Sequence, residues 1–534
     1  MASWLKRILK YHVGIGISLL FFTIGIATLP SYGITWDEPE NFFVGRVNLN
    51  IIATGNLRYL DDPNDLRVAP PLQFRADTHW ERYPPFASTV ASTFSWLLAE
   101  KLALIHPIDA HHAGVVLFGA LAVWATHALA LELTGSFVVG VIAAFTLFFF
   151  PQFFAHSHNN VKDIPLTALF VTALLYIVRA VRVGRMRDVL TASVVTGIAG
   201  ATKYNAVFLF PIALLLMVCV KGKTIMNQRS SHVGKGVIFL CISVISLFLA
   251  WPWVAIHPAD SLRLIYQYVS TVGRNLSVLF DGKTYGAGFD VPWYYAPAML
   301  AVVTPLPALA FCIVGICTSV GFGFAKDAHT RAKALPLLWI SVVLVRYLLP
   351  STVVYNGIRH FFEVAPALSV LTAYGIVWVG NWLARRIGRG KRQIIILCLA
   401  LFVIGHEIYV TVVMHPYQAV YFNEIVGGPK YASERFEFDY WGFSVKELVQ
   451  WVNTHESNRK KTLTVNWIGF SSKYFPGNSF DLITSGSATD YVIIPHSNNF
   501  FSGAQSYWRE RGTLLYAVQR MGADIGYLYA TGIR

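Results

Sequence analysis

The sequence predicts a polytopic α-helical membrane protein of about 11 transmembrane helices, followed by a small α/β domain outside the membrane. Hydrophobic residues make up 55% of the 534 residues and charged residues only 13%, whereas a soluble protein is normally about a quarter charged. The apolar residues come in blocks of about 20, the length that crosses a bilayer. Residues 415–534 shift to the mixed polar and apolar composition of a folded aqueous domain.

The first expected span is an uncleaved helix at the N-terminus. Basic residues precede an apolar run that ends near Leu29, and no small-x-small cleavage site follows it. This layout predicts a membrane helix whose N-terminus lies in the cytoplasm. The clear apolar blocks cover residues 11–30, 111–132, 136–154, 164–180, 188–203, 205–220, 235–256, 293–322, 335–350, 360–383 and 393–413.

One further block, residues 86–105, decides the topology, because every later helix would reverse if it crossed the membrane. When it does not cross, the basic residues of five segments all lie on the cytoplasmic side, as the positive-inside rule requires. Those segments are 6–10, 179–187, 221–235, 326–333 and 385–392. The block also carries a polar stripe at Ser88, Ser92 and Ser95. We therefore expect a helix that lies in the membrane interface.

This topology divides the chain into a membrane domain, residues 1–414, and an extracytoplasmic domain, residues 415–534. The membrane domain has two external loops, at 31–110 with interfacial helices and at 257–292. In the C-terminal domain, periodicity predicts helices and strands. The helices are expected at 444–455 and near 504–511, and the strands at 462–467, 491–495, 514–519 and 525–529.

Composition and motifs exclude several classes of function. The net charge is +14, but the basic residues cluster between apolar blocks, where they mark topology, so no nucleic-acid partner is expected. The five cysteines lie in or beside apolar blocks without a CxxC spacing, which is typical of packed thiols rather than a metal or redox site. P-loop, GxGxxG and GxSxG motifs are absent from the sequence.

The first candidate site follows the first membrane helix, in the segment 35–40. Asp37 and Glu38 lie there with a third carboxylate, just beyond the expected outer end of the helix. A carboxylate at the membrane surface can act as a general base. The structural alternative is a helix N-cap at Asp37, with Pro39 in the first turn.

The second candidate site is a polar turn between two apolar blocks, on the same expected side as Asp37. It contains His156, His158, Lys162 and Asp163. Two histidines and an aspartate could ligate a metal, but H-x-H with a distant Asp is a weak metal signal. The alternative is a plain helix connection, and the concentration of polar residues favours a functional role.

The third candidate site is cationic. Lys203 lies at an outer helix end, and Arg359 and His360 open a later apolar block on the same side. Basic residues at outer ends run against the positive-inside trend, and a bound phosphate would explain them. The alternative is a structural ion pair between Arg359 and Glu363, four residues apart on a helix.

These motifs, in this order and topology, resemble the GT-C superfamily of integral membrane glycosyltransferases. More narrowly, the chain is similar to the family 39 group, which includes protein O-mannosyltransferases and lipid A aminoarabinose transferases. The resemblance covers roughly residues 11–413, and the segment 421–442 resembles a tail of some bacterial members. It rests on Trp36-Asp37-Glu38, Glu81-Arg82-Tyr83-Pro84-Pro85, the run from His156 to Asp163, Ala201-Thr202-Lys203-Tyr204 and Arg359-His360.

The resemblance implies a GT-C type membrane domain that transfers a sugar from a polyprenyl-phosphate donor to an acceptor hydroxyl on the extracytoplasmic side. The acceptor would be a protein, lipid or glycan. Phosphate is a competent leaving group, so one base and cations for the developing charge are enough. The cell membrane, inner or plasma, is the expected location.

The residue roles implied by the resemblance divide into two groups. Asp37 would be the general base of an inverting reaction, and Glu38 and Asp163 complete the expected catalytic set. Asp163, with Glu38 and His158, would shape the sugar pocket or hold a divalent metal, a cofactor that the sequence leaves open. The expected substrate-binding residues are His156, His158, Lys162, Lys203, Arg359 and His360, of which Lys203, Arg359 and His360 would hold the lipid phosphate.

Three other functions remain open at the level of sequence. A transporter or flippase of a lipid-linked substrate would also place charges in membrane helices, although here the candidate groups cluster on one face. A ligase or polymerase with a diphosphate-linked glycan donor would keep the same fold. A membrane scaffold that binds a partner through its external tail would need no catalytic carboxylate.

Overall fold

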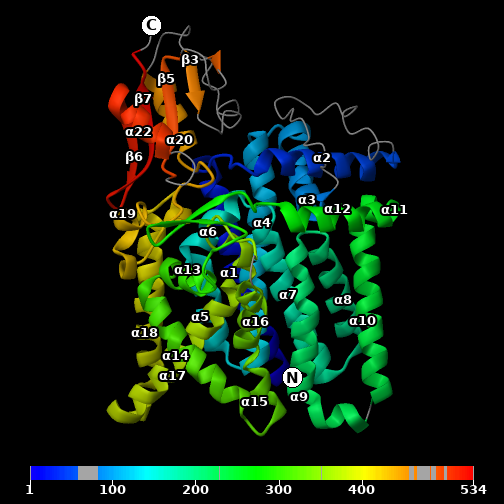
Figure 1. Cartoon of the computed structure of the whole chain (residues 1–534). Helices are drawn as coiled ribbons and strands as arrows, with labels where there is room; N and C mark the ends of the chain where they lie inside the picture. Colours follow the sequence, from blue (N-terminus) through cyan, green and yellow to red (C-terminus); the bar gives the residue numbers. More distant parts are fainter. Residues whose placement is uncertain are drawn as a thin grey trace.

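The computed structural model is a helical body with a small sheet-containing unit at one end (Figure 1). We call the end of the body next to this unit the domain face and the opposite end, where the N-terminus lies, the far face. The described residues are 2–57, 82–227, 229–349, 352–455, 462–465, 481–482, 489–497 and 502–532.

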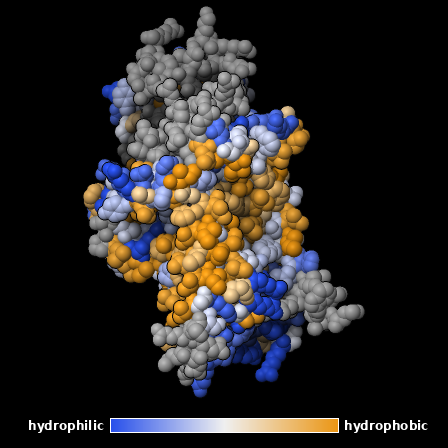
Figure 2. Space-filling model, turned by 90° about the vertical axis from the view of Figure 1, so that its right-hand side faces the viewer, coloured by the Kyte–Doolittle hydropathy of each residue, from blue (hydrophilic) through white to orange (hydrophobic). Residues whose placement is uncertain are grey.

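Eight helices of the described chain are long and apolar enough to cross a membrane, so the protein is a multi-pass membrane protein. A broad apolar band crosses the middle of the body, with hydrophilic residues above and below it (Figure 2). The eight spans are built on α1 (Ala2–Thr28), α4 (Pro107–Thr134), α7 (Asp163–Val183), α9 (Leu209–Asn227), α10 (Arg229–Ala250), α14 (Leu306–Gly323), α17 (Ala365–Ile387) and α18 (Arg392–Val413).

The other three of the expected spans form helices that are broken or short. α5 (Phe137–Phe149) and α6 (Pro151–Asn159) follow each other at an angle of 62°. Pro151 accounts for the break, because it has no N–H to donate to the preceding turn. α8 (Met186–Gly200) and α16 (Leu335–Leu344) have 15 and 10 residues.

The ambiguous block at 86–105 is not among the helices long enough to span. It forms α3 (Phe86–Ser95) and a π-helical segment, Trp96–Lys101. α3 packs beside α2 (Glu38–Thr54), which continues from the Asp37 segment on the domain face. α2 lies across the end of the body (Figure 1).

The serine stripe of this block packs against other parts of the protein. The sequence had predicted a polar face exposed in the membrane interface. Ser88, Ser92 and Ser95 are all buried. A Cβ at Gly45 of α2 would lie 2.1 Å from the Ser88 carbonyl oxygen, and Ser95 Oγ donates to the carbonyl oxygen of Pro107 at 3.2 Å. Small side chains on both helices are needed because the backbones approach this closely.

The external loop at 257–292 contains regular structure that the sequence did not predict. α12 (Pro258–Thr271) lies within this loop, and α11 (Pro252–Ile256) ends just before it; both helices lie across the domain face (Figure 1). An antiparallel hairpin follows, with β1 (Ser277–Phe280) paired to β2 (Lys283–Gly286). Two further helices in this half of the chain are α13 (Tyr295–Val303) and α15 (Ala328–Ala332).

The C-terminal unit confirms the expected small α/β domain. Its sheet has the order β4-β3-β5-β7-β6, with β3 parallel to β4 and β5, and β7 antiparallel to β5 and β6. The expected helices and strands all form, with bounds close to those predicted. They are α20 (Val445–His455), α22 (Ser502–Arg511), β3 (Thr462–Val465), β5 (Tyr491–Pro495), β6 (Thr513–Arg520) and β7 (Ala523–Ala530), with β4 (Asp481–Leu482) in addition.

The chain between α18 and α20 packs into the membrane domain. It forms short helices, of which α19 (Gly428–Ala432) is the longest. Tyr421, Phe438 and Trp441 are fully buried in the same apolar core as residues of α4, α6 and α7. This connecting segment therefore reaches the part of the domain face where the candidate site residues lie.

Candidate active site

A cavity of about 670 Å³ opens at the domain face, where several helix ends meet. Its charged lining contains two carboxylates and five cationic side chains. They are Asp37, Asp163, Lys162, Lys203, Arg274, Arg346 and Arg359, and Tyr83, Tyr204, Tyr268, Tyr355 and Tyr440 supply aromatic walls. Cationic side chains outnumber the carboxylates, so the lining carries a net positive charge, which favours an anionic ligand.

Asp37 occupies the N-cap position of α2, but its side chain makes no capping hydrogen bond. Instead, Arg359 Nη2 donates to Asp37 Oδ2 at 2.6 Å. The Asp37 side chain is 24% exposed, so it stays accessible from the cavity. The structural alternative of a plain N-cap therefore does not describe this carboxylate.

Arg359 is held by aromatic rings as well as by Asp37. Its guanidinium lies over the rings of Trp441 and Tyr355, at 4.6 and 5.6 Å from their centroids. The expected alternative partner, Glu363, accepts a hydrogen bond from Asn205 Nδ2 at 2.8 Å instead. A planar guanidinium can stack and donate at the same time, and this positions Arg359 at the cavity wall.

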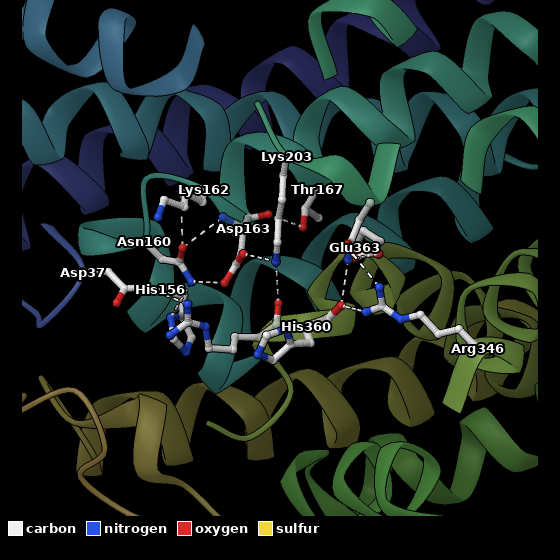
Figure 3. Close-up of polar contacts among 12 residues, drawn as sticks. Asp37, His156, Asn160, Lys162, Asp163, Thr167, Lys203, Arg346, His360 and Glu363 are labelled. Atoms are coloured by element: carbon white, nitrogen blue, oxygen red, sulfur yellow. Dashed lines mark hydrogen bonds and ion pairs between the residues drawn. The ribbon is translucent and has the colours of Figure 1, made fainter. Parts of the chain in front are cut away.

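Asp163 and Lys203 form the second ion pair of the cavity (Figure 3). Lys203 Nζ donates to Asp163 Oδ1 at 2.5 Å and to the Arg359 carbonyl oxygen at 3.1 Å. Asn160 Nδ2 donates to Asp163 Oδ2 at 2.8 Å, and the Asp163 amide donates to Asn160 Oδ1 at 2.9 Å. Both carboxylate oxygens of Asp163 are thus engaged, and the residue fixes the position of the Lys203 ammonium.

Lys162 and His360, two of the expected substrate-binding residues, also line the cavity. Lys162 Nζ lies 4.6 Å from the centroid of the Tyr83 ring. Burial lowers the pKa of Lys162, and the negative charge of Asp37 opposes this shift. The His360 ring packs edge-on against Tyr355 at 4.5 Å.

Glu38 lies away from the cavity, although the sequence grouped it with the catalytic carboxylates. Its Oε1 accepts hydrogen bonds from the amide and hydroxyl of Thr35, at 2.6 and 2.9 Å. Its Oε2 lies 2.6 Å from His112 Nε2 of α4, and both side chains are buried. Glu38 therefore ties the turn that carries Asp37 to α4.

The two histidines of α6 lie behind the cavity wall. His156 Nδ1 is 3.1 Å from Asn160 Nδ2, and its Nε2 is 3.4 Å from the Tyr440 hydroxyl. His158 stacks on the Tyr32 ring, with 3.8 Å between ring centroids. Its Nδ1 donates to the Phe154 carbonyl oxygen at 2.8 Å.

The expected grouping of Asp163 with Glu38 and His158 is not observed, because each has a different set of partners. His158 Nε2 lies 2.8 Å from Thr28 Oγ1 of α1, whereas Glu38 contacts Thr35 and His112. Within the described residues, no three His, Cys, Asp or Glu side chains come together as a metal site. These three residues thus give no common metal or sugar pocket.

Several cavity residues escaped the sequence interpretation. Tyr440 lines the cavity and comes from the tail segment 421–442, to which the sequence analysis attached no chemistry. The next residue, Trp441, is not a lining residue but stacks on Arg359. Arg346 was not among the expected site residues, yet it lines the cavity and donates to Asn205 Oδ1 at 3.2 Å and to the His360 carbonyl oxygen. Glu81 of the expected motif lies outside the described residues.

Fold and site together define a polytopic membrane protein with a positively charged cavity at one face. The fold is that of the GT-C glycosyltransferases, and the chain resembles the family 39 group within it. The family model of dolichyl-phosphate-mannose-protein mannosyltransferases matches residues 91–251, less than a third of the chain. No curated protein matches the sequence.

Two solved structures share the fold over nearly the whole chain. ArnT from Cupriavidus metallidurans, bound to undecaprenyl phosphate, has a TM-score of 0.55 at 12% identity, with 97% of each chain covered. The archaeal oligosaccharyltransferase AglB from Archaeoglobus fulgidus, in complex with an inhibitory peptide and a dolichol-phosphate, has a TM-score of 0.52 at 12% identity. That alignment covers 99% of this chain and 75% of AglB.

Proposed function

We propose that this protein transfers a sugar from a polyprenyl-phosphate donor to an acceptor hydroxyl at the domain face. The single observation that carries the proposal is the cavity in which Asp37 and Asp163 meet five cationic side chains. A phosphate leaving group needs cations, and an incoming hydroxyl needs one base. Both requirements are met by residues that lie at the ends of membrane helices.

Lys203 and Arg359 are the proposed ligands of the donor phosphate. Lys203 Nζ donates to the Arg359 carbonyl oxygen at 3.1 Å, so the two residues are adjacent at the cavity wall. ArnT and AglB, which share the fold, were solved with undecaprenyl phosphate and dolichol-phosphate. A lipid phosphate in the present cavity would receive charge-assisted hydrogen bonds from both side chains.

Asp37 is the proposed general base. The acceptor oxygen attacks the anomeric carbon, the bond from that carbon to the phosphate oxygen breaks, and the acceptor proton passes to the Asp37 carboxylate. Attack from the face opposite the phosphate inverts the anomeric centre. Arg359 contacts Asp37 before substrate enters, and the donor phosphate would draw the guanidinium towards itself and release Asp37 for the acceptor.

Asp163 is proposed as a positioning residue rather than a base, because both of its carboxylate oxygens already have partners. It holds Lys203 in the place where the leaving phosphate gains charge. The hydrogen bonds from Asn160 and Lys203 keep this carboxylate ionised and oriented. Its loss should therefore weaken donor binding together with turnover.

The orientation in the membrane follows from the same proposal. The domain face would be extracytoplasmic and the far face, with its basic loops, cytoplasmic, in a cell membrane of the inner or plasma type. The acceptor, a protein, lipid or glycan, would reach the cavity from the aqueous side. The donor chain would enter from the membrane.

The decisive experiment is release of free polyprenyl phosphate from a panel of polyprenyl-phosphate sugars with cell-extract acceptors. Wild type is compared with Asp37→Asn and with Asp260→Asn, an exposed aspartate of α12 outside the cavity. We expect release by wild type and Asp260→Asn, and a loss of about 10²–10⁴-fold in Asp37→Asn, the range of general base catalysis. Chelator is added in parallel to test for a metal.

The other outcomes point elsewhere. Equal release by wild type and Asp37→Asn would remove Asp37 as the base. Release only from a diphosphate-linked glycan would indicate a ligase or polymerase. Absence of release from every donor would favour a transporter or a scaffold.

A further inference from the structure

A second cavity lies between α7, α8, α9 and α10, near the far face, with a volume of about 460 Å³. Sites for small molecules typically have about 300–1,000 Å³. Val183, at the end of α7, lines this cavity, whereas Asp163, at the start of α7, lines the candidate active site. A helix of 21 residues separates the two by about 30 Å, so the second cavity is not part of the first.

The wall of the second cavity is apolar along most of its length. Phe210, Leu214 and Met217 of α9 and Leu240 of α10 are among its lining residues. Leu214 and Leu240 are also more than half exposed, so the cavity adjoins surface that contacts lipid in a membrane. Figure 2 shows the apolar band that crosses this side of the body. An acyl chain could pass from the bilayer into such a cavity without a polar barrier.

Three basic residues complete the lining, and no acidic residue is among them. They are Lys221 of α9 and His232 and Lys235 of α10. Lys235 Nζ donates to the Gly184 carbonyl oxygen at 2.9 Å, which holds the ammonium beside the turn after α7. His232 Nε2 is buried without a hydrogen-bond partner in the described part of the chain, and a buried polar atom of this kind normally has one.

Membrane topology alone explains why lysines lie at this face, but not why they line an apolar cavity. A lysine that only marks the cytoplasmic side needs water around it. Here the basic groups and the apolar wall belong to one hollow, which matches a molecule with a negative head and a hydrocarbon tail. Basic pockets between membrane helices are known to hold anionic lipid headgroups.

We propose that this cavity binds an anionic glycerophospholipid of the leaflet at the far face. One acyl chain lies against Phe210, Leu214 and Leu240, and the headgroup phosphate receives hydrogen bonds from Lys221 and Lys235. His232 Nε2 supplies a third contact at the same place. This site is separate from the proposed transferase site and does not depend on that function.

The test measures binding of phosphatidylglycerol and of phosphatidylcholine with the same acyl chains to the purified, delipidated full-length protein. Native mass spectrometry counts the lipid retained, and thermal unfolding reports stabilisation by it. We expect wild type to prefer phosphatidylglycerol. Lys221→Gln together with Lys235→Gln should bind it about 30-fold more weakly, because each lysine near a lipid phosphate contributes about 1 kcal/mol.

Two further variants separate this site from general surface charge. Arg389→Gln with Lys391→Gln removes two charges from the turn between α17 and α18, outside the cavity, and should keep the preference. Gly236→Phe fills the cavity with the lysines intact, since a Cβ at Gly236 meets nothing within 4 Å, and should abolish it. Equal binding of the two lipids by wild type, equal loss in the Arg389/Lys391 control, or normal binding by Gly236→Phe would each overturn the proposal.

Discussion

At the scale of single residues, Arg359 connects three separate parts of the chain. Its side chain donates to Asp37, its guanidinium stacks on Trp441, and its carbonyl oxygen accepts from Lys203. Lysine could not replace it, because an ammonium group does not combine a flat stacking surface with a fork of donors. The proposed base and the proposed phosphate ligands therefore depend on one residue for their relative positions.

The position of Glu38 yields a prediction that separates it from Asp37. Glutamine at position 38 can still accept from Thr35 through its carbonyl oxygen and donate to His112 through its amide. We therefore expect Glu38→Gln to retain transfer activity within about tenfold of wild type, whereas Asp37→Asn loses about 10²–10⁴-fold. Initial rates of polyprenyl phosphate release, measured on folded protein, provide the comparison.

Glu38→Ala is the companion variant, because it leaves the buried His112 ring and the Thr35 amide without partners. Leaving a buried hydrogen-bonding group without its partner typically costs about 1–3 kcal/mol, so this variant should unfold at a lower temperature. If Glu38→Gln lost as much activity as Asp37→Asn, a direct catalytic role for Glu38 would return.

Glu437 gives a second residue-scale prediction, this time about pH. Burial raises its pKa to about 7, against hydrogen bonds from the Gly357 amide and the Tyr295 hydroxyl. The folded state thus favours the protonated carboxyl. The preference for the protonated Glu437 carboxyl stabilises the folded state fully below the ordinary glutamate pKa, and this stabilisation is lost as pH rises through about 7. The total loss in the free energy of unfolding is about 3 kcal/mol.

Glu437→Gln should remove this dependence, because the amide stays neutral at every pH. Thermal unfolding of wild type and variant between pH 4.5 and 8 measures the difference. Glu510→Gln, at an exposed position of α22, serves as the control and should follow wild type. Parallel curves for Glu437→Gln and wild type would contradict the assignment.

At the scale of helices, α14 and α17 approach each other through glycines. A Cβ at Gly315 would lie 1.8 Å from the Leu371 carbonyl oxygen, and one at Gly375 would lie 1.9 Å from the Phe311 carbonyl oxygen. The obstacle in both cases is backbone, which cannot rotate away. Small residues at such crossings let membrane helices pack by van der Waals contact over a long interface.

We expect Gly375→Leu to separate α14 from α17 and to destabilise the protein by more than about 3 kcal/mol, the upper range for overpacking. Gly405→Leu is the matched control, because a Cβ at Gly405 of α18 meets nothing within 4 Å. Size-exclusion profiles and unfolding temperatures in detergent distinguish them. Equal stability of the two variants would show that the helices can move apart at little cost.

The C-terminal unit was the element best predicted from sequence, and the reason is periodicity. The residues of β5 and β7 form short runs rich in β-branched and aromatic side chains between turn residues, and α20 carries one clear apolar face. The loop at 257–292 gave no such signal. Its hairpin pairs only four residues on each strand.

The candidate site was predictable where charge stood out against an apolar background. Six of the expected site residues do line one cavity: Asp37, Asp163, Lys162, Lys203, Arg359 and His360. Their proximity could be predicted because the expected topology places all six at the same face. Glu38 carries the same kind of charge, and only its contact with His112 shows that it points elsewhere. Tyr440 could not be assigned, since an aromatic residue in an aromatic-rich chain has no distinguishing pattern.

At the scale of the whole molecule, the C-terminal unit is attached to the first membrane helix. Lys446 of α20 donates to the carbonyl oxygens of Pro30 and Tyr32, at 2.7 and 2.9 Å. Burial lowers the pKa of Lys446, and the two hydrogen bonds keep the chain beyond α1 in contact with the unit. Hydrogen bonds from a charged group contribute about 1.5–3 kcal/mol each.

We expect Lys446→Met to loosen this attachment. The C-terminal unit should become cleavable at protease concentrations that leave wild type intact, and transfer activity should fall because Tyr440 and Trp441 lie just before α20. Lys430→Met, at an exposed position of α19, is the control. Identical digestion patterns for wild type and Lys446→Met would show that other contacts hold the unit.

The packing of Trp441 on Arg359 also sets the time at which the cavity is complete during biosynthesis. Proteins are made from the N-terminus, so Asp37 and Asp163 emerge from the ribosome hundreds of residues before Tyr440, which lines their cavity, and Trp441, which packs on Arg359. A nascent chain threaded into the membrane carries the carboxylates and lysines but lacks the Tyr440 ring and the support of Trp441 for Arg359. The protein therefore gains its full set of cavity residues only after Tyr440 has been made and the tail has reached the domain face.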